Sequence, residues 1–256
     1  MHFKKYIFLV LVLVICKIGY TQDNYEIQVY GSETMTKGYT MVELHSNFTM
    51  DGTREISQQV LPTNHVQHET VEITHGFNNW FEVGFYFFNT LGSNNRSGYV
   101  GSHIRPRVML PEKYHFPVGL SMSAEVGYQK RRYSEDDWTL ELRPIIDKKI
   151  QSLYLCFNPV FDKSIHGINA STGFVFSPNA KISYDINKTF TPGLEYYGSV
   201  GTLNNILPAN LQQQNLFLSL DVDFNPDWEL NLGYGLGLNG NTDNEIFKCI
   251  LGWRFK

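Results

Sequence analysis

Many charged side chains of this 256-residue chain lie between apolar residues, within segments that alternate with a period of two. Glu72 lies between Val71 and Ile73, and Glu82 lies between Phe81 and Val83. Alternation with a period of two places such charges together on one face of a β-sheet. There they can pair with one another, or they can line a polar passage that selects solutes, and in either case they need partners or water. The candidate lining residues are Glu43, His45, Glu72, Glu82, His103, Arg105, Arg107, Glu125, Glu141, Arg143, Lys181, Glu195, Asp221, Asp223, Glu229 and Lys248.

Catalytic, metal and cofactor chemistry receive little support from the residue pattern. His45 and Ser46 are neighbours, as in some lipid-hydrolysing barrels, but alternation turns them to opposite faces, so the hydroxyl lacks its activating base. Cys156 and Cys249 fall on opposite faces, which disfavours a disulfide. No CxxC motif occurs, and we predict no catalytic residue, no metal and no cofactor. The remaining histidines lack metal-ligand spacing: His65, His68, His75, His103, His115 and His166.

The hairpin from His65 to Asn89 shows which kind of sheet must position the charges. Phe81, Val83, Phe85 and Phe87 share one face of its second strand, and Glu82 lies on the other. A soluble sheet buries its apolar face and wets its polar one. A transmembrane β-barrel turns a ladder of large apolar residues towards lipid and keeps polar residues in the lumen. This pattern recurs to the end of the chain, and it predicts a barrel.

Twelve segments have strand character, and their connections alternate in length. Longer ones follow the odd strands, such as residues 52–64 and 204–214, and shorter ones follow the even strands, such as residues 147–149. This is the arrangement of outer-membrane barrels, with long external loops and short periplasmic turns. We therefore predict an all-β fold, a transmembrane antiparallel up-and-down β-barrel of about twelve strands. The alternative is ten strands. The expected strands are 40–51, 65–76, 79–91, 98–110, 116–130, 137–147, 150–162, 170–186, 189–202, 213–224, 228–238 and 245–255.

Prolines are the feature that fits this prediction least well. A closed barrel has no free edge where the missing N–H would be harmless, so we expect them to mark bulges or misplaced strand boundaries. They are Pro106, Pro144, Pro159, Pro178 and Pro192. The lipid faces carry no Lys or Arg, and aromatic residues gather near the turns, where interfacial girdles are expected.

The N-terminus predicts export. Lys4 and Lys5 precede an apolar run from Ile7 to Ile15, followed by a region of small and polar residues, which is the pattern of a signal peptide. We predict a signal peptide over 1–21, an N-terminal periplasmic segment over 22–39, either outside the barrel or inserted into it, and the transmembrane barrel over 40–256. Cys16 raises a lipoprotein signal as an alternative, although bulky Ile15 precedes it. Losing the three lysines of residues 1–21 moves the formal charge from -4 to about -7, which excludes a strongly basic, nucleic-acid-binding protein.

Two segments carry a resemblance to known families. The alternating C-terminal run that ends at Phe255 resembles the signal read by the barrel-assembly machinery of Gram-negative outer membranes, although Lys256 follows the usual final aromatic residue. The hairpin HETVEITHGFNNWFEVGFYFFN is similar to a segment of the outer-membrane barrels named for the MetA pathway of phenol degradation, over roughly Val42 to Phe255. That resemblance implies a transport or channel role and no catalytic residues.

These observations favour a passive outer-membrane channel for small or hydrophobic solutes. Two stretches of small inward residues predict free space beside the charges: Gly119, Ser121, Ser123 and Gly127, and Gly233, Gly235 and Gly237. Twelve strands lie between eight, which side chains nearly fill, and sixteen, which open a channel, so we expect a narrow or partly plugged lumen. The alternative is a structural or partner-binding barrel with a plugged, ion-paired lumen. The expected partners are outer-membrane lipid, the assembly machinery and an unknown solute, with no nucleic acid.

Overall fold

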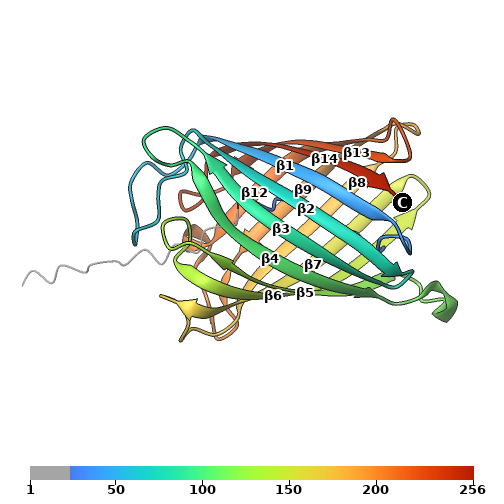
Figure 1. The fold of residues 1–256 in the computed structure, drawn as a ribbon, viewed down its shortest axis with the longest axis horizontal. Helices are drawn as coiled ribbons and strands as arrows, with labels where there is room; N and C mark the ends of the chain where they lie inside the picture. The colour runs from blue at the N-terminus through green and yellow to red at the C-terminus, as the bar shows by residue number, and fades with distance from the viewer. Residues whose placement is uncertain (1–23) are drawn as a thin grey trace, which may run out of the picture.

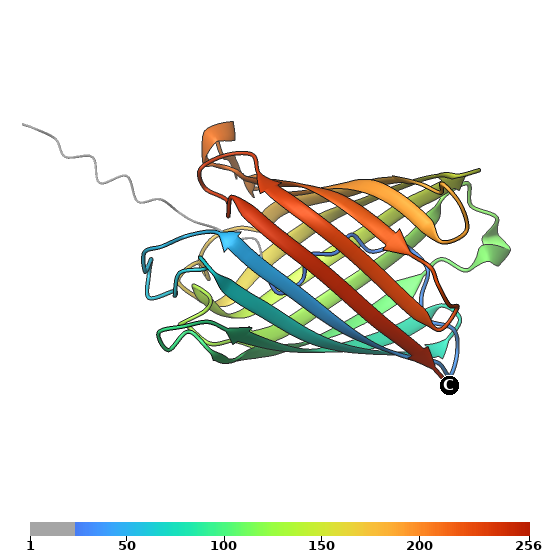
Figure 2. The same ribbon diagram turned by 90° about the horizontal axis from the view of Figure 1, so that it is seen from above.

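Residues 24–256 of the computed structural model form a closed antiparallel β-barrel of twelve long strands (Figures 1 and 2). The predicted signal peptide and Cys16 lie outside the described residues. The strands are β1 (Thr40–Asp51), β2 (Val66–Asn78), β3 (Phe81–Leu91), β4 (Gly98–Met109), β5 (Gly119–Gln129), β6 (Asp136–Ile150), β7 (Leu153–Gly167), β8 (Val175–Tyr184), β9 (Phe190–Ser199), β12 (Gln213–Val222), β13 (Trp228–Gly237) and β14 (Glu245–Phe255).

Each of these strands pairs with its neighbours in chain order, and β1 closes the ring by pairing with β14 from Thr40↔Phe255 onward. The step from β9 to β12 skips only a small hairpin, β10 (Gly201–Thr202) and β11 (Asn205–Ile206), in the loop after β9. Two short 3-10 helices, η1 (Glu112–Tyr114) and η2 (Ala209–Leu211), lie in connections. The predicted twelve strands are confirmed, and the alternative of ten is wrong.

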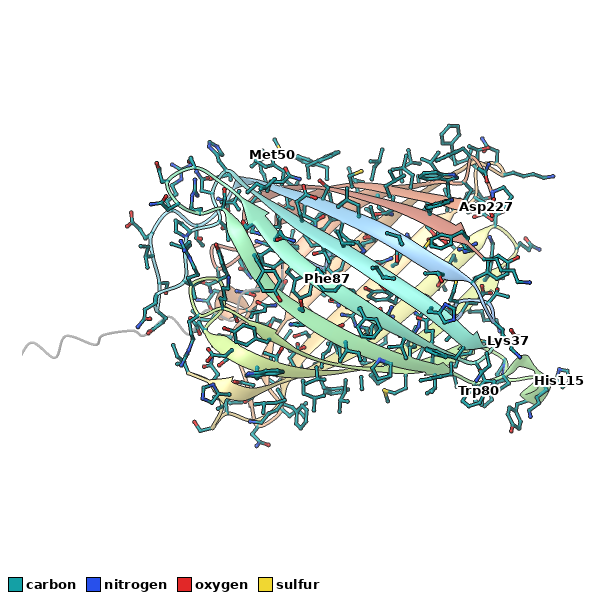
Figure 3. All side chains as sticks on the ribbon, in the orientation of Figure 1. Lys37, Met50, Trp80, Phe87, His115 and Asp227 are labelled. Carbon is teal, nitrogen blue, oxygen red and sulfur yellow. The ribbon has the colours of Figure 1, made fainter. Side chains whose placement is uncertain are left out.

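Side chains alternate between the two faces of the wall as the sequence predicted. On β3, Phe85 and Phe87 are exposed, whereas Glu82 and Tyr86 are buried inside. Figure 3 shows Phe87 on the outer surface at mid-barrel. Leu44 and Leu218 on other strands are also exposed at outward positions. An outer band of this kind suits contact with hydrocarbon. Within residues 24–256, no helix is long and apolar enough to cross a membrane.

Long and short connections lie at opposite ends of the barrel, which we call the loop end and the turn end. Met50 lies near the loop end, and Trp80, His115 and Asp227 lie at the turn end (Figure 3). The connection over 110–118 is longer than the other turns and contains η1. Aromatic rings stack at the turn end, where Trp228 packs against Phe224 and Trp253.

Several strand boundaries differ from the prediction, and two of them place an expected turn or loop inside a strand. The expected turn at 147–149 belongs to β6, and the chain turns at Gln151 and Ser152, where Gln151 has a φ of 56°. The expected loop over 162–167 likewise belongs to β7. The polar character of Asp147 suggested a turn, but its carboxylate points inward and accepts hydrogen bonds from the backbone and the hydroxyl of Ser32. A strand residue that faces a polar lumen therefore resembles a turn residue in sequence.

The prolines lie inside strands and cause neither bulges nor boundary shifts. Pro159 of β7 lies directly opposite Pro178 of β8 within a continuous register. Between β6 and β7, pairing is missing over Arg143–Ile145 but resumes in the same register at Ile146↔Phe157. All five prolines lie on the outward face. Each is two positions from an outward apolar residue of the same strand, and residues two apart in a strand share a face. The wall thus loses individual hydrogen bonds at prolines and keeps its register.

The outward face of β12 provides a test of this orientation. Replacing Leu218, which is 67% exposed in mid-strand, by Arg should lower the free energy of unfolding in lipid vesicles by about 2–4 kcal/mol, because a guanidinium would lie in hydrocarbon. Val222 also faces outward but is the last residue of β12, and Val222→Arg should cost only about 0–1 kcal/mol. Urea titration followed by tryptophan fluorescence measures both. Equal effects of the two substitutions would contradict the assigned depth.

Candidate functional site in the barrel lumen

The N-terminal segment, residues 24–37, runs through the lumen from the loop end to the turn end (Figure 2). At the loop end, the amide of Asn24 donates to Asp243 in the β13–β14 loop at 2.6 Å, and Asn47 of β1 donates to the Asn24 carbonyl. At the turn end, the backbone N–H of Gly38 donates to the carbonyl of Gly76 on β2 at 2.7 Å. Of the segment predicted over residues 22–39, the described residues 24–37 lie inside the barrel.

Inward side chains of β4 and β7 hold the backbone of this N-terminal segment. Arg107 of β4 donates to the carbonyls of Gly31 and Glu33, at 3.0 and 2.8 Å. Asn158 of β7 accepts from the Tyr30 N–H at 2.9 Å and donates to its carbonyl at 3.0 Å. An extended segment in a lumen has no sheet partner, so these side chains satisfy backbone groups that would otherwise be buried without partners.

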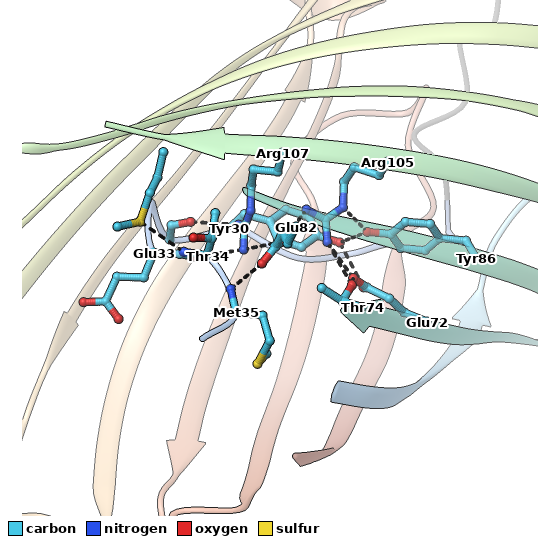
Figure 4. Close-up of polar contacts among 12 residues, drawn as sticks. Tyr30, Glu33, Thr34, Met35, Glu72, Thr74, Glu82, Tyr86, Arg105 and Arg107 are labelled. Carbon is cyan, nitrogen blue, oxygen red and sulfur yellow. Dashed lines mark hydrogen bonds and ion pairs between the residues drawn. The ribbon is translucent and has the colours of Figure 1, made fainter. Parts of the chain in front are cut away.

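The first ion-pair network joins β2, β3 and β4 (Figure 4). Arg105 contacts Glu72 at 2.6 Å and Glu82 at 3.2 Å, and it also donates to the Tyr86 hydroxyl. Arg107 contacts the same Glu82 carboxylate at 2.7 Å. All four charged side chains are less than a tenth exposed. Two guanidinium groups therefore neutralise two carboxylates in the middle of the wall.

The second network lies on the opposite part of the wall. Lys248 of β14 contacts Glu195 of β9 at 2.5 Å, and Lys181 of β8 contacts both Glu195 at 3.1 Å and Asp221 of β12 at 2.7 Å. Lys248 also donates to the carbonyl of Ile27, which links this network to the N-terminal segment. Side chains from four strands thus share one set of charges.

The other candidate lining residues occupy less connected places. His103 contacts Glu125 at 2.5 Å, and Arg143 contacts Glu141 at 2.6 Å. Glu229 is half-buried and pairs with Arg254 at the turn end. Asp223 follows β12 and is exposed. Glu43 and His45 are buried on β1.

The inward residues that sequence reasoning overlooked are aromatic and neutral. Tyr30 of the N-terminal segment lies with its ring 4.8 Å from the Arg105 guanidinium and 4.7 Å from that of Arg143. Cation–π contacts of this kind place one ring between charges of two walls. Asn158 donates to the Tyr30 carbonyl, and Tyr197 packs in the same buried cluster as Ile27. Both side chains point inward from the wall. Their position in the alternation marked them as inward, but they carry no charge.

The predicted free space beside the small residues is wrong. A Cβ atom at Gly235 would overlap the ring of Phe217, one at Gly233 would contact the alkyl chain of Lys248, and one at Gly127 would overlap the ring of His103. At Gly119 the space holds the side chains of Ser32 and Asp147. These glycines exist because large side chains of the neighbouring strand, or of the N-terminal segment, lie across them.

A cavity of about 820 Å³ nevertheless opens beside the N-terminal segment at the turn end. Its acidic lining residues outnumber the lysines: Glu33, Glu43, Asp147, Asp185, Glu195, Asp221, Asp223 and Glu229 against Lys148, Lys149, Lys181 and Lys248. A hydrogen bond from Lys149, at 2.6 Å, lowers the pKa of Asp185 in the β8–β9 turn. Towards the loop end, Ile27, Tyr197, Phe217 and Ile246 pack together and are buried. We call the 820 Å³ cavity at the turn end the vestibule.

Nucleophilic chemistry finds no arrangement to support it at the residues first considered. His45 is fully buried inside, whereas the Ser46 hydroxyl lies on the outer side and donates to Glu69 at 2.8 Å. The two side chains therefore cannot act as a nucleophile and its base. Cys156 and Cys249 are both free thiols. They lie on inward and outward positions, as predicted from the alternation.

Comparisons with known proteins identify the fold. No family model matches the chain, and no curated protein matches it, so the resemblance to the barrels of the MetA pathway stays a prediction. Among solved structures, it is similar to an outer membrane channel from Pseudomonas putida F1, with a TM-score of 0.58 and 10% identity over 90% of this chain and 100% of that one.

Two further structures show the same likeness. The KdgM porin has a TM-score of 0.55 and 12% identity, and the NanC porin has a TM-score of 0.55 and 13% identity. Each match covers 84% of this chain and 99% of the other. At such identities the likeness concerns architecture alone. The chain therefore has the fold of a twelve-stranded, porin-like outer-membrane β-barrel.

Proposed function

We propose that this protein is a passive outer-membrane channel for small solutes, and that the N-terminal segment closes its lumen. The vestibule carries the proposal. It is a polar cavity of about 820 Å³ that enters the barrel from the turn end and stops where the segment packs against the wall. A barrel built only to be filled would not need an open half. The fold of the similar porins supports the same function by analogy.

The lining of the vestibule favours one class of solute. Eight carboxylates face four lysines there, so the cavity has an excess of negative charge. Lining charges of one sign select solutes of the opposite sign. We therefore propose small, polar and preferably cationic solutes. Hydrophobic compounds, the other class considered from the sequence, fit this charged lining less well.

Loosening the N-terminal segment should open the channel. The double substitution Arg107→Ala and Asn158→Ala removes side chains that bind the backbone of Tyr30, Gly31 and Glu33. In planar bilayers it should give longer and larger cation-selective openings than the unmodified protein. The matched control is Arg96→Ala, which removes an arginine that binds the carbonyls of residues 62 and 64 in a loop. Closed records from the folded double variant, equal to those of the control, would contradict the channel.

A second candidate, a structural barrel with a plugged lumen, rests on the buried ion pairs. Arg105→Ala should lower the free energy of unfolding by about 3–5 kcal/mol, because it leaves Glu72 and Glu82 buried with one partner fewer. Arg254→Ala breaks a partly exposed pair and should cost only about 0–1 kcal/mol. Urea unfolding in vesicles measures both. A large loss at Arg105 combined with no conductance in any variant would favour this second candidate.

We also propose that the loop end faces the cell exterior and the turn end the periplasm, as in barrels with long external loops. The Asn24 end of the N-terminal segment then lies towards the cell surface and Tyr39 towards the periplasm. In intact cells, a membrane-impermeant maleimide should label Gln58→Cys in the loop over 52–65 and not Gln151→Cys in the β6–β7 turn, with Cys156 and Cys249 replaced by Ser. Labelling only at position 151 would reverse the topology.

A further inference from the structure

We propose that Glu43, His45 and Glu72 form a binding site for a divalent transition-metal ion such as Zn²⁺ on the inner wall between β1 and β2. One ligand atom from each residue lies within 4.8 Å of the others, and this is the only such group among the described residues. All three side chains are buried, with 7%, 0% and 1% exposure. Imidazole and carboxylate groups together are typical ligands of Zn²⁺.

Strand register brings the three residues together. Glu43 lies directly opposite Glu72 in the β1–β2 pairing, and His45 lies two residues along β1 on the same inward face. Two carboxylates directly opposite each other destabilise a sheet unless a positive charge lies between them. Arg105 offsets Glu72, but within residues 24–256 the carboxylate of Glu43 has no hydrogen bond or ion pair. A cation bound here would remove the repulsion.

The buried imidazole of His45 is a second, independent observation that supports a metal site. Its side chain is fully buried, and neither ring nitrogen has a hydrogen-bond partner within the part of the chain that the structure describes. A buried imidazole without partners is costly. Its Nε2 points to Oε2 of Glu72 at 3.5 Å, which is too far for a good hydrogen bond. That spacing is close to the distance of about 3.3 Å between two ligand atoms of a tetrahedral zinc ion.

Glu72 can bind a metal without giving up Arg105. Its Oε1 accepts from Arg105 at 2.6 Å and from the Thr74 hydroxyl at 2.6 Å. Its Oε2 faces His45 and, at 3.5 Å, the Tyr30 hydroxyl. The first oxygen is therefore engaged in the network, whereas the second is directed to the proposed site. Arg105 would then support the ligand from behind, as second partners of metal-bound carboxylates do.

The site is reachable from outside the barrel. Of the three proposed ligands, Glu43 is the one that lines the vestibule, so an ion that enters at the turn end can reach this carboxylate. Three protein ligands leave one position of a tetrahedral ion open towards that cavity. The inference does not depend on conduction, because a metal could bind to an open or a closed barrel.

Isothermal titration of the purified full-length protein in detergent with ZnCl₂, in chelator-free buffer, tests the proposal. One ion should bind per chain. Glu43→Gln and His45→Gln should each weaken binding by more than about 10–100-fold, the loss caused by removing merely a supporting group. The control is His68→Gln, which replaces another buried histidine whose ring nitrogens lack partners, but which has no carboxylate pair beside it. It should bind zinc like the unmodified protein.

Three results would overturn the proposal: no zinc binding by the unmodified protein, unchanged binding by Glu43→Gln, or equal weakening by His68→Gln. Glu43→Gln keeps the shape of the side chain and breaks no contact of the described chain, so it tests the proposal even if His45→Gln fails to fold. Equal weakening by His68→Gln would assign the ion to another place. A rise in thermal stability with zinc, absent from Glu43→Gln, gives an independent readout that requires no transport.

Discussion

Closure of the sheet is the constraint on which the rest of this structure depends. A strand in hydrocarbon cannot leave its backbone groups without partners, and the pairing of β1 with β14 removes the last free edge. Once the ring is closed, every strand residue faces either lipid or lumen. Apolar side chains such as Phe87 take the first place, and most charged side chains of the strands, with exceptions such as Glu69 beside Ser46, are accommodated in the second. The dense polar interior follows from this division.

The interior resolves its charges by sharing them. Glu82 contacts two arginines, and Glu195 contacts two lysines, so single carboxylates link several strands. The N-terminal segment takes part in the same scheme, because its carbonyls accept from Arg107 and Lys248. Charges that would be too costly in an empty lumen therefore help to hold the segment, and the segment in turn fills the space around them. Glycines such as Gly235 permit this packing by leaving room for a neighbouring ring.

A lumen organised in this way has two unlike halves. Towards the loop end, apolar residues of the segment and the wall pack around Ile27 and Phe217, with the Lys248 ammonium beside them. Towards the turn end, the vestibule is open, and its polar lining is rich in carboxylates. The contrast is compatible with both candidate functions: the packed half would provide stability, and the vestibule would provide a place for solutes. The buried His45 lies beside Glu72, a carboxylate of the first ion-pair network.

The sequence by itself determined the architecture, because alternation and loop length are local. Phe81 to Phe87 set the outward face, and the parity of the connections set the strand count. Only the tertiary structure decided which charges meet, since Glu195 and Lys248 are distant in sequence and join through strands that ring closure brings together. The same holds for Gly235, which appeared to leave space until Phe217 of the adjacent strand occupied it, and for Glu43, whose opposition to Glu72 depends on register. The sequence could not decide the path of the N-terminal segment for the same reason. Its partners are scattered over β1, β4, β7 and β14, and no local pattern in the chain encodes their convergence.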